Sequence, residues 1–300
     1  MRWRGRERSS NIEDRRSAGG GFGRMGGMGG AGPRIRIGRG GGIGGLALVL
    51  GIVVVSMMLG IDPSQILSGD LSGLRTGGTI ARPAPSAGDD ELAAFVSVVV
   101  KDTEDTWGAV FSQNSLTYTP PKVVLFSGTT SAACGVASAS TGPFYCPADR
   151  KVYIDLSFYD QLRRQFGAPG DFAEAYVLAH EIGHHVQNLI GVLPAFNKAR
   201  AGMSKTEANA YSVRVELQAD CYAGVWAHSA NAEGLLEKGD LEEALNAASR
   251  IGDDTLQKQA QGYAVPDSFT HGTSAQRVKW FRVGYANGNP GACDTFSGSD

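Results

Sequence analysis

The stretch His180-Glu181-Ile182-Gly183-His184 decides how this chain is interpreted. Two histidines four residues apart lie on the same face of a helix, so their imidazoles can bind one metal ion. Glu181 follows the first histidine, where a carboxylate lies beside a zinc-bound water without binding the metal itself. The motif therefore predicts a Zn²⁺ site with His180 and His184 as ligands and Glu181 as general base.

The surrounding sequence predicts one long helix. Asp171, with Glu174 three residues later, has the pattern of a helix start, and Gly191 suits the left-handed residue that ends a helix. Gly183 costs about 1 kcal/mol inside a helix relative to alanine. Two explanations stay open for it: close approach of substrate to the metal, or close packing of another element. His185 is rotated about 100° from the neighbouring ligand, and we expect a packed position there.

The next predicted helix offers the third protein ligand that a catalytic zinc site needs. Ser204 and Glu207 form a capping-box pattern at its start. Glu216 and Asp220 share a face, so we expect Glu216 to bind the metal while Asp220 accepts the second N–H of a ligand histidine. A solvated acidic face is the alternative, but the apolar neighbours of both carboxylates predict burial. His228 lies about 120° from Glu216 around this helix and is not expected to be a ligand.

His271 lies in a loop before a third amphipathic run. A loop histidine beside the metal is a suitable donor to the carbonyl oxygen that gains negative charge during hydrolysis. We expect His271 to play this part. Arg277 is expected either behind the ligands, as Asp220 is, or beside His271 as a second donor. Local capping or packing is the alternative for His271.

These motifs resemble a known group of enzymes. The pattern His-Glu-x-x-His, then Glu-x-x-x-Asp, then a Thr-His loop with an arginine six residues later resembles the glutamate-liganded zinc peptidases of the membrane-bound heat-shock and prenyl-protein protease type. A closer resemblance is to the bacterial family described as putative neutral zinc metallopeptidases. The matching segments cover most of the chain and are 1–3, 13–16, 106–108, 142–149, 152–155, 180–185, 216–224 and 269–277. This resemblance implies a zincin-like peptidase domain with His180, His184 and Glu216 as ligands and Glu181 as base.

Three segments precede the predicted domain. Residues 1–42 contain ten arginines, three acidic residues and many glycines, which predicts a disordered basic tail. Residues 43–61 carry no charge and as a helix would span about 28 Å, close to the thickness of a bilayer core, so we predict one transmembrane helix. A cleaved signal peptide is the alternative, although its apolar core is usually shorter. Residues 62–90 are rich in Ser, Gly and Pro and predict a linker, which leaves 91–300 as the metallopeptidase domain.

Charge and cysteine content predict where the domain lies. Residues 1–42 carry a net charge of +7 and the remainder −9, for a total of −2. Positive segments stay inside, so we expect a single-pass protein of the cytoplasmic (inner) membrane with an extracytoplasmic domain. Four cysteines follow the membrane segment, and of three possible pairings we favour Cys134 with Cys146 and Cys221 with Cys293. No nucleic-acid partner is expected, because Trp3 stands alone without interleaved stacking partners.

The predicted fold class is α+β, a small sheet packed on the helices that carry His180 and Glu216. Apolar residues from Leu92 to Phe111 recur at helical spacing, while Lys122–Phe126 and Val152–Leu156 read as strands. The second of these strands is expected to pair with an extended substrate at the sheet edge. We expect a membrane-anchored zinc metallopeptidase that acts on a peptide or protein substrate. The alternatives are a membrane-anchored zinc-binding scaffold with a closed site, and hydrolysis of a non-peptide amide or ester.

Overall fold

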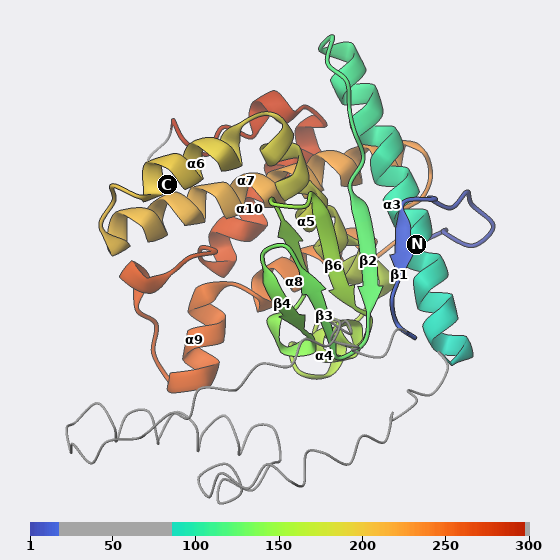
Figure 1. Ribbon diagram of the computed structural model, residues 1–300, viewed down its shortest axis with the longest axis horizontal. Helices are drawn as coiled ribbons and strands as arrows, with labels where there is room; N and C mark the ends of the chain where they lie inside the picture. The colour runs from blue at the N-terminus through green and yellow to red at the C-terminus, as the bar shows by residue number, and fades with distance from the viewer. Residues whose placement is uncertain (18–85, 298–300) are drawn as a thin grey trace, which may run out of the picture. The chain divides into compact units, whose positions relative to one another are not determined.

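A computed structural model describes residues 1–17 and 86–297 of the chain, which mix two small sheets with a larger number of helices (Figure 1). The strands are β1 (Ile12–Asp14), β2 (Lys122–Phe126), β3 (Thr129–Ala132), β4 (Gly135–Ser138), β5 (Phe144–Cys146) and β6 (Lys151–Asp155). The longer helices are α3 (Ala87–Gln113), α5 (Asp171–Leu189), α7 (Lys205–Ala232) and α10 (Ser274–Asn287). The shorter ones are α4 (Ser157–Arg164), α6 (Val192–Arg200), α8 (Asp240–Arg250) and α9 (Asp253–Gln261). Three 3-10 turns are η2 (Ala139–Thr141), η3 (Pro266–Ser268) and η4 (Pro290–Ala292). This architecture confirms the predicted α+β class.

The larger sheet has the strand order β1-β2-β6-β5. β1, β2 and β6 run parallel, and β5 pairs antiparallel with β6. Strand β2 has the predicted bounds, but β6 is flanked on both sides and is not the edge strand we expected. The edge strand next to β6 is β5. Its three residues are too few to show a strand pattern in the sequence. Strands β3 and β4 form a separate hairpin.

The first seventeen residues belong to this folded unit, which corrects the prediction of a disordered tail over 1–42. β1 pairs with β2 in the register Ile12 to Val123, and Met1 and Trp3 are buried in the main core. Ser9 exchanges hydrogen bonds with Ser97 of α3, where its N–H lies 2.9 Å from the Ser97 carbonyl oxygen. Arginine and glycine content concealed this segment, because its apolar residues are few and each is used. The domain also includes residues 86–90, where Ser86 caps α3.

The predicted single-pass orientation stays a prediction. β1 and β2 belong to one sheet, so both lie on the same side of any membrane. The predicted transmembrane helix (43–61) lies outside the described residues, as does most of the predicted linker (62–90). Among the helices of residues 1–17 and 86–297, none is sufficiently long and apolar to span a bilayer.

The predicted disulfides are both formed. Cys134 pairs with Cys146 and ties the β3–β4 hairpin to β5, while Cys221 pairs with Cys293 and ties the C-terminal segment to α7. No described cysteine is free.

Candidate metal centre

Helices α5 and α7 approach closely at the predicted ligands because Gly183 has no side chain. A Cβ built on Gly183 would lie 3.1 Å from the carbonyl oxygen and 3.2 Å from the Cα of Ala219. This contact decides between the two explanations for Gly183 in favour of helix packing. It also brings one turn of α5, with His180 and His184, against the turn of α7 that carries Glu216.

The three predicted ligands meet at this point. Oε2 of Glu216 lies 3.1 Å from Nε2 of His180 and 3.4 Å from Nε2 of His184, and one ligand atom from each residue falls within 4.8 Å of the others. Zinc bonds of about 2.0–2.1 Å at tetrahedral angles place neighbouring ligand atoms about 3.3–3.4 Å apart. The donor set and its spacing therefore fit a zinc ion held by three protein ligands, with a fourth position left over.

Hydrogen bonds to the other ring nitrogens orient both imidazoles. Nδ1 of His180 lies 2.9 Å from Oδ1 of Asp220, and Nδ1 of His184 lies 2.8 Å from Oε1 of Gln187. Both partners are acceptors, so each Nδ1 donates and each Nε2 presents its lone pair to the common centre. Asp220 takes the predicted position. Gln187 was not predicted, although it lies one turn after His184.

The electrostatics of the cluster favour a cation at its centre. Burial alone would lower the pKa of His180, but Asp220 and Glu216 outweigh it and raise that pKa to about 10. Burial alone would raise the pKa of Glu216, but His184 and His180 lower it well below its ordinary value. A proton or a divalent cation is therefore stabilised between these side chains.

Arg277 lies behind the ligands, which is one of its two expected positions, and does not lie free beside the reacting carbonyl. Its Nε lies 2.8 Å from Oδ2 and its Nη2 2.9 Å from Oδ1 of Asp220. Nη2 also donates to the hydroxyl of Tyr176 at 3.1 Å, and Nη1 to the carbonyl oxygen of Ile251 at 3.2 Å. The Tyr176 hydroxyl lies 2.5 Å from Oδ1 of Asp220. All three guanidinium nitrogens of Arg277 are thus committed to the protein, and the pKa of Asp220 falls to about 2 as Arg277 and His180 outweigh its burial.

The close packing of α7 on α10 makes this bidentate pair possible. A Cβ on Gly284 would lie 1.9 Å from the carbonyl oxygen of Cys221, and one on Gly224 would lie 2.1 Å from that of Phe281. Only glycine at both positions allows the two helices to cross at this separation. Arg277 then reaches Asp220 from the first turn of α10.

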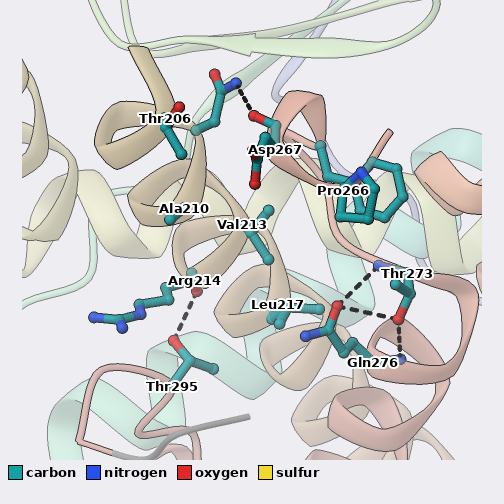
Figure 2. A pocket seen from close by; sticks show the side chains of 12 residues that line it. Thr206, Ala210, Val213, Arg214, Leu217, Pro266, Asp267, Thr273, Gln276 and Thr295 are labelled. Carbon is teal, nitrogen blue, oxygen red and sulfur yellow. Dashed lines mark hydrogen bonds between the residues drawn. The ribbon is translucent and has the colours of Figure 1, made fainter. Parts of the chain in front are cut away.

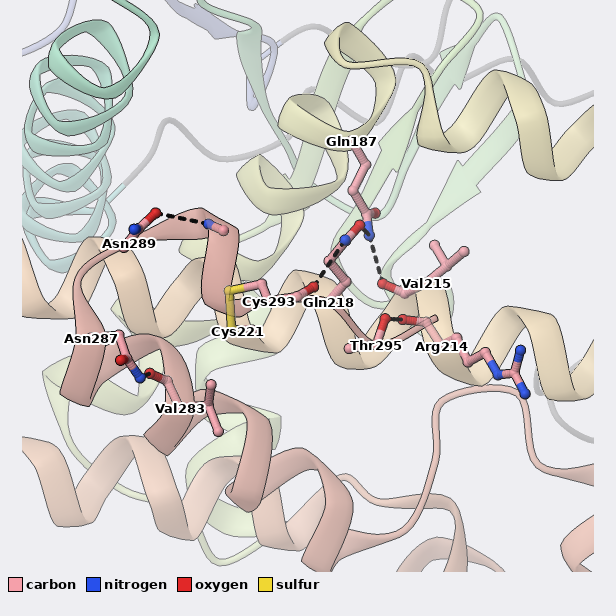
Figure 3. Close-up of a disulfide and its surroundings, with 11 residues drawn as sticks. Gln187, Arg214, Val215, Gln218, Cys221, Val283, Asn287, Asn289, Cys293 and Thr295 are labelled. Atoms are coloured by element: carbon pink, nitrogen blue, oxygen red, sulfur yellow. Dashed lines mark hydrogen bonds between the residues drawn. A yellow bond between two sulfur atoms is a disulfide. The ribbon is translucent and has the colours of Figure 1, made fainter. Parts of the chain in front are cut away.

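A second chain of hydrogen bonds supports His184 and ends at a disulfide (Figure 3). Nε2 of Gln187 donates to the carbonyl oxygen of Val215 at 2.7 Å and to Oε1 of Gln218 at 3.0 Å. Nε2 of Gln218 in turn donates to the carbonyl oxygen of Cys293 at 3.0 Å. The Cys221–Cys293 disulfide therefore holds the last acceptor of this chain against α7.

A cavity of about 430 Å³ opens beside the three ligands. Glu181, His271 and the three ligands line it. Glu181 is buried, and its carboxylate forms no hydrogen bond or ion pair with any other residue that the structure describes. Half-buried apolar side chains line the rest of the cavity, among them Phe144, Phe158, Phe166, Ile251 and Leu256. The site thus combines an unpaired carboxylate with room for a substrate and apolar contacts for its side chains.

His271 faces the cavity but lies outside the ligand cluster. Its imidazole turns toward Asp253, with 3.3 Å between Nδ1 and Oδ1. Asp253, which the sequence analysis did not identify, also accepts backbone N–H groups of this loop. A residue that acts through main-chain hydrogen bonds leaves no spacing pattern in a sequence.

A different cavity of about 490 Å³ lies between α7 and the segment 266–276 (Figure 2). No predicted site residue lines it. Phe269 and Thr273, from the segment that carries His271, are among its lining residues. A Cβ on Gly272 would lie 3.2 Å from the side chains of Leu217 and Val213, which also line this cavity. These contacts fix the loop against α7.

The other predicted helix features are placed as follows. His185 is buried and lies 2.7 Å from the carbonyl oxygen of Thr119, and burial lowers its pKa to about 4, so it is a packed position as expected. His228 contacts the carbonyl oxygen of Tyr285. The capping box at Ser204 is confirmed. Asp171 does not cap α5; Gly170 holds that position.

Asp171 instead forms part of an acidic group with Asp240 and Glu243, the second cluster among the described residues with metal-ligand spacing. The α-amino group of Met1 lies 2.9 Å from Asp171 and 3.2 Å from Asp240. This ammonium supplies the positive charge that the cluster needs. The cluster is therefore an internal ion pair at the start of α5.

Comparisons with known proteins identify the family of the chain. The family model described as "Putative neutral zinc metallopeptidase" matches residues 1–296. The Escherichia coli K12 protein named "Uncharacterized protein YpfJ" is 50% identical over 303 residues, which cover 100% of both chains. The Mycobacterium bovis protein named "Uncharacterized protein Mb2605" is 44% identical over 270 residues, 82% of this chain and 86% of its own length. No solved structure matches.

Proposed function

We propose, from the premise that this chain belongs to the putative neutral zinc metallopeptidase family, that it hydrolyses peptide bonds. Zn²⁺ is the cofactor of the family. The observation that carries the proposal is the pairing of a three-ligand zinc site with Glu181, a cavity-lining carboxylate without a partner among the described residues. In this proposal the fold is zincin-like.

Each residue of the site has a separate role in the proposed reaction. His180, His184 and Glu216 would hold the metal, and Asp220 and Gln187 orient the two imidazoles. When bound there, zinc would supply Lewis-acid chemistry that polarises the substrate carbonyl and lowers the pKa of water. Glu181 accepts the proton of the attacking water and passes it to the leaving amine. His271 donates to the carbonyl oxygen as that oxygen gains negative charge.

The edge strand beside the cavity favours an extended peptide over a small amide or ester. Phe144 and Tyr145 of β5 line it, and the outer edge of β5 has no strand partner in the described part of the chain. A peptide that adds to this edge gains main-chain hydrogen bonds and places its side chains in the cavity. The substrate-pairing strand in our proposal is therefore β5.

The scaffold alternative requires a fourth protein ligand that closes the site. Asp220 is committed to His180, Tyr176 and Arg277, and His271 is turned toward Asp253. Among the described residues the ligand cluster contains three members. An open fourth position supports catalysis over a purely structural site.

Glu181→Gln tests the proposal directly. We expect this variant to bind zinc with unchanged stoichiometry and to lose about 10²–10⁴-fold in hydrolysis of a mixed quenched-fluorescence peptide library. His180→Ala should lose zinc as well. Unchanged peptide cleavage by Glu181→Gln would exclude the proposed mechanism.

We further propose that the domain acts on the extracytoplasmic side, where an oxidising environment maintains its two disulfides. Association of residues 43–61 with the membrane stays a prediction. Single cysteines introduced by Ser10→Cys and Ser112→Cys, both at exposed positions, distinguish the arrangements. A membrane-impermeant maleimide applied to intact cells should label both. Labelling at residue 112 alone would support the single-pass orientation.

A further inference from the structure

The loop that carries His271 is closed around the carboxylate of Asp253. Oδ2 of Asp253 accepts the backbone N–H groups of Thr270 at 2.7 Å, His271 at 2.6 Å and Gly272 at 3.1 Å. The N–H of Asp253 returns a bond of 2.9 Å to the carbonyl oxygen of Gly272. Four hydrogen bonds thus join three consecutive loop residues to the first residue of α9.

The opposite side of the loop is fixed by α7. Gly272 has a φ of +94°, a conformation that favours glycine, and its backbone lies against Val213 and Leu217. The loop is held between Asp253 and α7, so the His271 backbone has little freedom. Its position relative to Glu216, which lies next to Leu217 on α7, is fixed by the same contacts.

The remaining oxygen of Asp253 faces the His271 side chain. Oδ1 lies 3.3 Å and the Thr270 hydroxyl 3.0 Å from Nδ1 of His271. The Asp253 side chain is 12% exposed, whereas that of His271 is 53% exposed and lines the cavity. With Nδ1 engaged, Nε2 of His271 has no hydrogen-bond partner among the described residues and is the nitrogen available to a substrate.

We propose that Asp253 is a positioning residue that presents Nε2–H of His271 as a cationic donor to the substrate carbonyl oxygen. This inference rests on the proposed peptidase function. It goes beyond a loop-capping role, because the backbone N–H groups of the loop bind Oδ2 alone, whereas Oδ1 lies beside the imidazole. A charged donor forms a stronger bond to a developing oxyanion than a neutral one.

The charges around His271 support this part for Asp253. The hydrogen bond that the His271 imidazole donates to Asp253 is the largest influence on the pKa of His271. Burial lowers this pKa, Glu216 raises it and Arg277 lowers it, and the net result is a raised pKa. These groups come from α9, α7 and α10. Asp253 is the one in direct contact with the imidazole.

Asp253→Asn separates positioning from capping. The amide oxygen still accepts the three N–H groups, while the negative charge beside Nδ1 is lost. In the zinc-loaded full chain we expect kcat to fall about tenfold with KM little changed, and the alkaline limb of the kcat/KM profile to move to lower pH. Asp254→Asn is the matched control, since Asp254 accepts from Ser274 at the same helix start and does not touch His271. Its pH profile should equal that of the wild type.

A measurement on the unaltered protein covers the case in which Asp253→Asn does not fold. The ¹⁵N resonances of His271 in zinc-loaded wild type should titrate above the ordinary histidine value of about 6.5. Titration at or below that value would overturn the inference. A wild-type pH profile in folded Asp253→Asn, with Glu181→Gln inactive, would overturn the role of Asp253 alone. Absence of any zinc-dependent peptide cleavage by wild type would remove the peptidase function and this inference with it.

Discussion

The two sides of the cavity are built by different means. On the ligand side, side chains of α5, α7 and α10 contact one another across close helix crossings, and Asp220, Tyr176 and Arg277 are buried there or nearly so. On the His271 side, one carboxylate collects main-chain N–H groups and leaves an exposed imidazole. In the proposed function, the first side would hold the metal and stabilise the domain, while the second would act on the substrate.

The largest expected effect comes from breaking the ligand side at Asp220. Asp220→Ala leaves Arg277 buried without its partner and His180 without its acceptor. Loss of one member of a buried charge pair costs about 3–5 kcal/mol, and loss of a carboxylate behind a ligand histidine weakens metal binding about 10–100-fold. Urea unfolding and zinc titration measure the two effects. Asp220→Asn, which keeps the shape, should lie between this variant and wild type, and equal stability of all three would contradict the comparison.

His271→Ala tests the other side. We expect full zinc content and near wild-type stability, with a loss of about 10²–10³-fold in kcat. Elemental analysis of the purified protein and peptide hydrolysis measure these quantities together. A parallel loss of zinc and activity would show that the two sides are not separate.

Gly183→Ala probes the helix crossing that assembles the ligands. The added methyl group meets backbone atoms of Ala219 at 3.1–3.2 Å, so α7 must move away from α5. The expected net cost is about 1–2 kcal/mol, with weaker zinc binding. Gly108→Ala is the matched control on α3, where nothing lies within 4 Å, and should stabilise by up to about 1 kcal/mol. Stabilisation by both substitutions would remove the role assigned to this contact.

The last expected effect is confined to part of the pH range and comes from Glu174 on α5. Burial raises the pKa of Glu174 to about 8, with Arg163 opposing the shift. The folded chain therefore binds more protons than the unfolded chain between pH 4.5 and about 8, and the free energy of unfolding falls as pH rises through this window. Glu174→Gln should equal wild type near the lower limit and exceed its stability by roughly 2 kcal/mol above the upper one. Urea unfolding across the range measures this, and a difference independent of pH would contradict it.

The comparison also explains what the sequence reveals. His180, His184, Glu216 and Asp220 lie at i,i+4 spacings on helices, so their shared faces follow from helix geometry, and the structure brings them together. Asp253 was not predicted from the sequence, because its partners are backbone groups seventeen to nineteen residues later, for which no residue type is diagnostic. Arg277 was recognised as part of the site, but the bidentate contact that fixes its role depends on how closely α10 crosses α7.

The fold divides in the same way. β2, α3, α5 and α7 carry enough periodic residues to be recognised, whereas β1 and β5 have three residues each and gain strand conformation only from their neighbours. Pairing of Cys134 with Cys146 and of Cys221 with Cys293 followed the sequence expectation. The prediction of a disordered tail was wrong for residues 1–17 because it rested on their charge and glycine content, although β1 is a strand of the domain itself.

The position of β1 has a consequence for biosynthesis. Its register partner in β2 lies about 110 residues later, so at roughly 5–20 residues per second β1 waits about 5–20 s for β2 to be synthesised. The β1–β2 pair therefore forms only after two segments that are far apart in the sequence have met. A recombinant fragment trimmed to begin at residue 86 would expose the backbone edge of β2, and such an edge is a template for aggregation.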